Sequence, residues 1–277
     1  MSRHDQPVIA SRTASSVPVV ILCGGKGSRI REAGPLVPKP MLTIGDRPIL
    51  WHIMKLYGAH GFTEFVLALG YLGDVIRTFV LHYEALTRDF TLEFGKPDGI
   101  QYLQDQSELG WRVSCVETGA ETLTGTRVRR AIAHLSSDTI MVTYGDGVGD
   151  IDLTALLAFH RSHPGLATMT TVRPPGRFGE LLVDGDDRIV SFEEKPQTST
   201  GTINGGFMVF DREAIERYIP EDVDVMLERD PLNQLARDGE LYAFRHDGFW
   251  QPMDTPRERE LLQGLWDAGK APWRTWA

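Results

Sequence analysis

The chain has little cysteine, no long apolar run and no excess of positive charge, and each shortage excludes a class of protein. Its only cysteines are Cys23 and Cys115, too few for a disulfide framework or a cysteine-rich zinc site. No apolar run approaches the roughly 18 residues of a membrane span, and residues 1–16 lack the apolar core of a signal peptide. A net charge of −9 argues against nonspecific nucleic-acid binding. These absences predict a cytoplasmic protein that binds neither membrane nor nucleic acid.

The rest of the composition, with 42% hydrophobic and 24% charged residues, is that of an ordinary globular protein. Continuously apolar segments alternate with segments of helical periodicity, a pattern typical of βαβ units and a parallel sheet. In the first half, the pattern predicts strands at 19–23, 65–69, 111–117 and 139–144, and helices at 48–57, 73–83, 128–135 and 153–162. Residues 87–111 are less periodic, and we interpret them as an insertion.

The second half changes character and contains more hairpin signals. It predicts strands at 167–172, 203–210 and 240–245, a hairpin of 180–183 with 189–193, and helices at 212–218, 230–238 and 256–266. We find no internal repeat and no linker. The sequence therefore predicts a flexible leader at 1–16 and a single α/β domain at 17–277.

A glycine-rich loop follows the first predicted strand, and a lysine between two prolines comes shortly after it. Its residues are Gly24, Gly25, Gly27, Ser28 and Arg29, and Pro38-Lys39-Pro40 follows ten residues later. Glycines without Cβ atoms let backbone N–H groups wrap an anion. Neither the Walker A motif nor the dinucleotide fingerprint matches, because Ile30 stands where the fingerprint needs its third glycine. The loop predicts a nucleotide phosphate cradle, with a plain structural turn as the alternative.

Two carboxylates, Asp146 and Asp254, are isolated in the sequence, and Asp146 is a candidate Mg²⁺ ligand. Asp146 lies between two glycines after a buried strand, and open α/β sheets place ligand chemistry at such strand ends. Its alternative role is that of a turn residue. We expect Asp152 to cap the following helix. The segment 124–130 places hydroxyl groups and arginines at a helix start, which predicts either an anion site or helix capping with solvated arginines.

Taken together, several motifs resemble those of the sugar-1-phosphate nucleotidylyltransferases. These motifs are Leu22-Cys-Gly-Gly-Lys-Gly-Ser-Arg29, Pro38-Lys-Pro-Met41, Tyr144-Gly-Asp-Gly147, Glu194-Lys-Pro196, Asn204-Gly-Gly206 and Trp250-Gln-Pro-Met-Asp254. The resemblance implies a Rossmann-like α/β fold with a mixed, mainly parallel central sheet flanked by helices and a smaller antiparallel β part that binds the sugar. It also implies a nucleotide-binding half at about 17–165, a sugar-phosphate-binding half at about 166–277, and a homo-oligomer.

The resemblance implies a role for each matching residue. Mg²⁺ would be the cofactor, held by Asp146 and Asp254. The catalytic residues would be Arg29, Lys39, Asp146 and Lys195. The nucleotide would be bound by Leu22, Gly24, Gly25, Gly27, Ser28, Arg29, Lys39, Thr124, Gly125, Arg127 and Asp146. The sugar phosphate would be bound by Tyr144, Gly179, Glu194, Lys195, Asn204 and Trp250.

Longer similar stretches at 48–55, 174–179 and 248–255 narrow the implied activity. They imply transfer of a cytidylyl group from CTP to α-D-glucose 1-phosphate by in-line attack on the α-phosphorus, giving CDP-glucose and pyrophosphate for deoxysugar synthesis. Two departures from the pattern, Val37 in place of a lysine and a missing Thr-Trp pair near 225–227, leave other substrates open. The alternatives are dTTP or UTP, another hexose 1-phosphate, or a regulator that binds a nucleotide sugar without catalysis.

Overall fold

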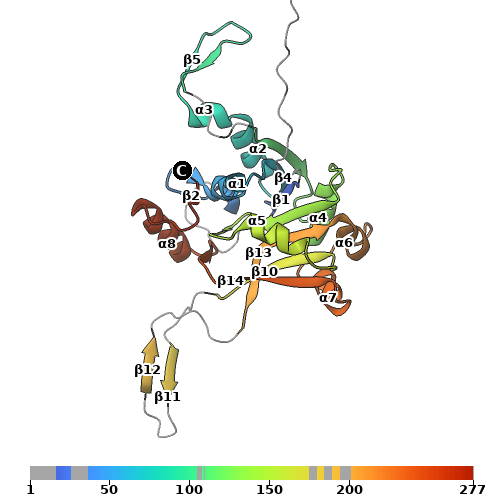
Figure 1. The fold of residues 1–277 in the computed structure, drawn as a ribbon. Coiled ribbons are helices and arrows are strands. Elements are labelled where there is room, and N and C mark those ends of the chain that lie inside the picture. Colours follow the sequence, from blue (N-terminus) through green and yellow to red (C-terminus); the bar gives the residue numbers. More distant parts are fainter. Residues whose placement is uncertain are drawn as a thin grey trace, which may run out of the picture.

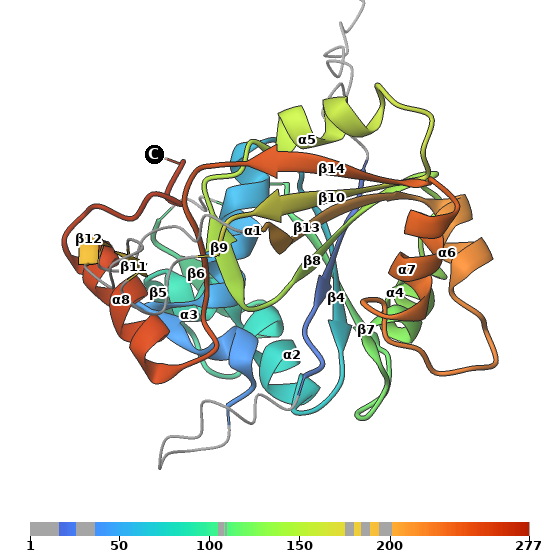
Figure 2. The ribbon, with the colours of Figure 1, turned by 90° about the horizontal axis from the view of Figure 1, so that it is seen from below.

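The computed structural model describes residues 17–25, 37–104, 108, 110–174, 180–183, 189–193 and 201–276. Within these residues a seven-stranded sheet forms the centre of the molecule (Figures 1 and 2). Its strand order is β14 (Leu241–His246), β10 (Ala167–Val172), β13 (Ile203–Asp211), β8 (Thr139–Tyr144), β1 (Val19–Leu22), β4 (Glu64–Leu69) and β7 (Arg112–Glu117). Every neighbouring pair is parallel except the two pairs that involve β13. The predicted mixed, mainly parallel sheet is confirmed.

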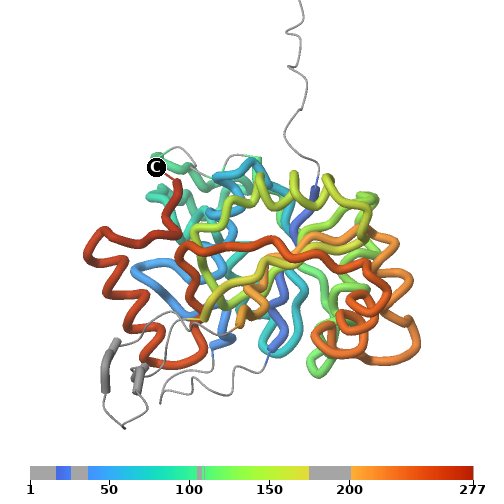
Figure 3. The backbone as a smooth tube through the Cα atoms, turned by 60° about the horizontal axis from the view of Figure 1, so that its bottom comes forward, coloured from blue at the N-terminus to red at the C-terminus, as the bar shows by residue number. Residues whose placement is uncertain are grey.

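Helices cover both faces of this sheet, which explains why its strands read as continuously apolar. Side chains alternate along a strand, so Val19 and Ile21 of β1 enter one core while Val20 and Leu22 enter the other. The first core is closed by α1 (Ile49–Ala59), α2 (Gly73–Leu81), α5 (Leu153–His160) and α8 (Pro256–Asp267). The second is closed by α4 (Thr124–Ile132), α6 (Arg212–Tyr218) and α7 (Asp230–Arg237). Figure 3 shows α8 (red) and the pair α6 and α7 (orange) on opposite sides of the molecule.

The two halves of the chain share the central sheet, because β10, β13 and β14 of the second half extend it beyond β8. Smaller antiparallel pairs accompany it: β9 (Gly147–Gly149) with β15 (Trp250–Pro252), β11 (Glu180–Val183) with β12 (Ile189–Glu193), and β2 (Thr43–Ile44) with β3 (Arg47–Pro48). The hairpin predicted from 180–183 and 189–193 is therefore confirmed.

The predicted helices are present, and the largest difference in a boundary lies at α4. We expected that helix at 128–135, whereas it begins at Thr124. Asp152 caps α5 as predicted, because its Oδ1 accepts from the backbone N–H of Ala155 at 2.9 Å. The predicted insertion contains α3 (Tyr83–Thr87) and an antiparallel pair of β5 (Phe90–Leu92) with β6 (Ile100–Tyr102). No helix in the described ranges is long and apolar enough to cross a bilayer, and the cytoplasmic location stays a prediction.

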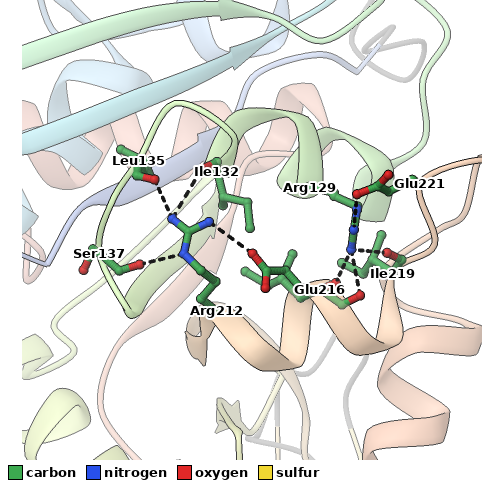
Figure 4. A network of polar contacts seen from close by, with 9 residues as sticks. Arg129, Ile132, Leu135, Ser137, Arg212, Glu216, Ile219 and Glu221 are labelled. Carbon is green, nitrogen blue, oxygen red and sulfur yellow. Dashed lines mark hydrogen bonds and ion pairs between the residues drawn. The ribbon is translucent and has the colours of Figure 1, made fainter.

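Two arginines join α4 to α6 by capping each other's helices (Figure 4). Arg129 of α4 donates to the backbone carbonyl groups of Glu216 and Ile219, at 2.8 and 2.7 Å, at the end of α6. Arg212, the first residue of α6, donates to the carbonyl oxygen of Ile132, the last residue of α4, at 3.5 Å, and to that of Leu135 in the following loop at 2.6 Å. The last carbonyl groups of a helix have no hydrogen-bond partner within that helix. Each arginine therefore donates to unpaired carbonyl groups at the end of the other helix.

Candidate active site

A cavity of about 340 Å³ lies at the carboxyl ends of β1 and β8. The strand order reverses here, because β4 pairs with one edge of β1 and β8 with the other. Ligands of open α/β sheets bind at such a switch point. The lining residues are Leu22, Cys23, Gly24, Gly25, Lys39, Pro40, Thr122, Leu123, Thr124, Arg127, Tyr144, Gly145, Asp146, Met226 and Asp254. Many predicted site residues are thus brought to one place.

Some predicted site residues lie outside the described residues, so their roles stay predictions. They are Gly27, Ser28, Arg29, Gly179, Glu194 and Lys195. Of the glycine loop, Gly24 and Gly25 are described. A Cβ atom on Gly24 would lie 2.2 Å from the Cζ atom of Arg127, so a larger residue there would displace the Arg127 guanidinium. Cys23 is fully buried, which raises the pKa of its thiol and agrees with the predicted packing role.

Lys39 lies in the cavity between the two predicted metal ligands. It begins the short helix η1 (Lys39–Met41), where Pro38 and Pro40 restrict the backbone on either side. Its Nζ donates to Asp146 Oδ2 at 2.6 Å and also to Asp254 Oδ1. Burial alone would lower the pKa of Lys39, but the two carboxylates raise it above the ordinary lysine value. Lys39 therefore remains a cation in the cavity.

Asp254 reaches Asp146 because two distant segments pair. β15 runs antiparallel to β9, and the N–H of Met253 donates to the carbonyl oxygen of Asp146 at 2.8 Å. The N–H of Asp254 donates to Glu258 Oε2 at 2.7 Å, and Glu258 also forms a capping box with Thr255 at the start of α8. The backbone on both sides of the Asp254 carboxylate is therefore fixed.

The two carboxylates fit a divalent cation, because oxygen ligands are those that Mg²⁺ prefers. Asp146 and Asp254 both reach the single Nζ atom of Lys39, so one cation between them is in contact with both. Across the described ranges, no group of three or more His, Cys, Asp or Glu side chains is arranged to hold a metal. The described protein thus offers two ligands, a number suited to Mg²⁺, which usually keeps waters and binds substrate phosphates.

Arg127 is buried and ties three strand ends together. Its Nη1 donates to the carbonyl oxygen of Leu69, the last residue of β4, at 3.0 Å and to Thr118 Oγ1, just after β7, at 2.8 Å. Its Nη2 donates to the carbonyl oxygens of Gly24, after β1, at 3.0 Å and of Ala120 at 3.2 Å. Burial lowers the pKa of Arg127. The guanidinium thus supports the glycine loop, and its contact with a nucleotide stays a prediction.

The start of α4 favours the capping interpretation over an anion site. The N–H of Gly125 donates to the carbonyl oxygen of Val225 at 3.0 Å, and the N–H of Leu123 donates to Asp224 Oδ1 at 3.0 Å. Arg130 donates to the carbonyl oxygen of Thr118 at 2.8 Å. The segment 224–227, which lacks the expected Thr-Trp pair, therefore covers the first N–H groups of α4.

The remaining sugar-site predictions meet in a hydrogen-bond network that includes a residue missed by the sequence analysis. Asn204 Nδ2 donates to Tyr144 Oη at 3.2 Å, and Tyr144 Oη lies 2.5 Å from Glu228 Oε1. Trp250 Nε1 donates to the carbonyl oxygen of Gly205 at 2.7 Å, beside Asn204 on β13. Glu228 lies between predicted elements in a segment with no motif, so nothing in its spacing marks it.

The sequence matches the nucleotidyl transferase family over residues 18–256, and the chain belongs to this family. It is 43% identical over 258 residues to the glucose-1-phosphate cytidylyltransferase of Salmonella typhi, covering 93% of this chain and 98% of that protein. It is 40% identical over 257 residues to a probable glucose-1-phosphate cytidylyltransferase of Bacillus subtilis (strain 168), covering 93% and 99%. The family predicted from the motifs is confirmed.

Among solved structures, the fold is similar to that of HddC from Yersinia pseudotuberculosis. The two superpose with a TM-score of 0.65 and 22% sequence identity, over 90% of this chain and 99% of the other. At this identity the likeness concerns the fold, and it agrees with the predicted Rossmann-like architecture.

Proposed function

We propose that the protein transfers a cytidylyl group from CTP to α-D-glucose 1-phosphate and releases CDP-glucose and pyrophosphate. The observation that carries the proposal is the cluster of Lys39, Asp146 and Asp254 in a cavity at the switch point of the sheet. The choice of substrates rests on 43% identity, along nearly the whole chain, to a protein named for them.

In the proposed reaction, an oxygen of the sugar phosphate attacks the α-phosphorus of CTP in line. A new P–O bond forms, the bond from the α-phosphorus to the oxygen bridging to the β-phosphate breaks, and pyrophosphate leaves with the electron pair. Both reactants are anions, and two unit charges about 4 Å apart repel by about 4 kcal/mol at an effective dielectric near 20. The Lys39 ammonium offsets this repulsion and stabilises charge on the phosphate oxygens.

Asp146 and Asp254 would hold the Mg²⁺ cofactor. When bound, the ion neutralises charge on the phosphates and helps to orient them. Such a transfer needs positioning and electrostatics rather than a protein nucleophile. We retain Arg29 as the proposed partner of the reacting phosphorus and Lys195 as the proposed partner of the sugar phosphate.

We also propose that the protein is a homo-oligomer, with the β5–β6 hairpin as part of the contact between copies. Figure 1 shows β5 beyond α3, away from the central sheet. Large apolar side chains of this region are exposed, and Phe94 is 92% exposed. An isolated two-stranded hairpin is at best marginally stable, and exposed apolar patches mark contact sites. We expect Phe94→Asp to lower the oligomer mass measured by analytical ultracentrifugation; an unchanged mass would exclude this hairpin from the contact.

The direct test is a panel of CTP, dTTP and UTP against several hexose 1-phosphates, scored by pyrophosphate release with Mg²⁺. We expect the fastest release from CTP with glucose 1-phosphate. A faster reaction with another pair would move the assignment to those substrates. Nucleotide binding without any pyrophosphate release would favour the regulator instead.

A further inference from the structure

The carboxylate of Glu228 accepts hydrogen bonds from two side chains that line the cavity. Its Oε1 lies 2.5 Å from Tyr144 Oη, and its Oε2 lies 2.5 Å from Thr124 Oγ1. Tyr144 and Thr124 both line the cavity, at the end of β8 and the start of α4. One carboxylate therefore holds two hydroxyl groups that reach the wall from different elements.

The direction of these hydrogen bonds is fixed by chemistry. A carboxylate has no proton to donate, so each hydroxyl group must donate its single hydrogen to Glu228. Each hydroxyl oxygen also accepts a bond: Tyr144 from Asn204 Nδ2 at 3.2 Å, and Thr124 from the N–H of Leu227 at 3.0 Å. Neither hydroxyl group has a hydrogen left, so each can offer only its remaining lone pair to a further partner.

We propose that Glu228 is a positioning residue that fixes Tyr144 and Thr124 as hydrogen-bond acceptors, so that this part of the cavity selects hydroxyl and amino groups of the substrates. The inference deepens the proposed function and rests on it. A phosphate oxygen is itself an acceptor and gains nothing from such a surface. Lys39 supplies the complementary donor beside Asp146. Glu228 thereby helps to orient each substrate, with phosphates toward Lys39 and hydroxyl groups toward the side chains that it holds.

The substitution Glu228→Gln tests this role because it keeps the shape of the side chain and removes one acceptor. One hydroxyl group then faces an amide NH₂, loses its acceptor and turns its hydrogen away. We expect KM for glucose 1-phosphate or for CTP to rise about tenfold, with a much smaller change in kcat, since the interaction concerns binding. The matched control is Glu213→Gln, which alters an exposed carboxylate on α6 and should leave both KM values unchanged.

A second comparison asks whether Glu228 acts through Tyr144. If it does, the double variant Tyr144→Phe with Glu228→Gln raises KM for glucose 1-phosphate no more than the larger single change does. The deoxy analogues of glucose 1-phosphate give a further check. At least one should bind the wild type more weakly than glucose 1-phosphate does, and should lose that disadvantage in Tyr144→Phe. If Glu228→Gln fails to fold, this comparison still tests the step on which the inference depends, which is that Tyr144 accepts from a substrate hydroxyl group; equal binding of all the deoxy analogues to wild type would overturn it.

Two further results would overturn the inference: KM values of Glu228→Gln within about twofold of wild type for both substrates, or single effects that multiply in the double variant. Failure of the proposed function has a different signature. The wild type would then release no pyrophosphate from CTP and glucose 1-phosphate, whereas the inference is judged by the ratio of variant to wild type on whichever pair reacts.

Discussion

The ammonium group of Lys39 lies 2.6 Å from the carboxylate of Asp146, and the same Nζ atom also contacts Asp254. The residue proposed to neutralise phosphates and the two proposed to hold Mg²⁺ therefore form one ion cluster. The ammonium group of Lys39 lies between the two carboxylates, at the place where a single cation can contact both of them. A metal ion bound there would compete with Lys39 for the same charges, and we expect a displaced Lys39 to turn toward the phosphates.

This competition predicts that Lys39→Met raises the affinity of the nucleotide-free protein for Mg²⁺ or Mn²⁺ while it lowers turnover. We expect a gain of about tenfold or more, because the ion pairs that oppose metal binding are each worth up to about 4 kcal/mol in a partly buried site. Electron paramagnetic resonance of Mn²⁺ measures the affinity directly. Lys270→Met, on an exposed lysine, is the control for charge alone. Metal affinity that is unchanged or weaker in Lys39→Met would show that Lys39 does not compete.

Asp146→Asn should lower turnover by about a hundredfold or more while the fold survives, because a charge that acts on the transition state is lost. The side chain is 35% exposed in the cavity, so the amide causes little packing strain. Pyrophosphate release measures the rate, and circular dichroism with thermal unfolding measures the fold. Asp138→Asn, an exposed aspartate, is the matched control. A near wild-type rate in Asp146→Asn would remove Asp146 from the metal site.

Lys195→Ala should weaken the binding of glucose 1-phosphate by about 1.5–3 kcal/mol, the value of one charge-assisted hydrogen bond. The role of Lys195 rests on the resemblance of Glu194-Lys-Pro196 to the family pattern. Calorimetric titration with each substrate separates the two binding sites, and an unchanged affinity for CTP is the internal control. Equal weakening of both substrates would indicate a general structural effect rather than a contact with the sugar phosphate.

The sequence predicts the sheet and several site residues because their signals are local. The middle of β8 is apolar because it is buried on both faces, and Asp146 stands out because glycines flank it at the strand end. Cys23 is identified as a packing residue by the apolar strand before it. Each of these conclusions needs only a few neighbouring residues.

What the sequence does not predict depends on contacts between distant segments. Lys39 and Asp254 are 215 residues apart and meet only because β15 pairs with β9. In the sequence, Arg127 looks like a cation that is free to bind a ligand. In the structure, four protein acceptors surround its guanidinium and give it a structural role, which the spacing of residues in the sequence does not indicate. Glu228 is found only through the hydroxyl groups folded against it.

The two arginines Arg127 and Arg129 should respond differently to the same substitution. Arg127→Met leaves the buried carbonyl group of Gly24 and other acceptors without their donor, so we expect a loss of about 3 kcal/mol in the free energy of unfolding. It should also raise KM for CTP, because Gly24 belongs to the cavity wall. Arg129→Met should cost about 1–3 kcal/mol at the end of α6 without changing KM. Urea unfolding measures the stability and initial rates measure KM. An unchanged KM for CTP in Arg127→Met would show that Arg127 contributes to stability and not to nucleotide binding.

His52 should make the stability of the protein fall in weak acid. The side chain is fully buried, its Nε2 lies 2.9 Å from the carbonyl oxygen of Ile44, and Trp273 Nε1 lies 3.4 Å from its Nδ1. Since the indole only donates, Nδ1 accepts, and the ring is neutral with its proton on Nε2. Burial lowers the pKa of His52 from 6.5 to about 4.

Between about pH 6.5 and pH 4, the unfolded chain therefore binds a proton at this site that the folded protein does not, and acid favours unfolding by up to about 3 kcal/mol. Above the unfolded pKa the term vanishes, because the imidazole is neutral in both states. Urea unfolding at about pH 7.5 and pH 4.5 measures the effect in wild type and in His52→Gln. The stability difference between the two proteins should shrink toward acid pH, since the variant lacks this proton. A difference that stays constant would mean that His52 is protonated in the folded state too.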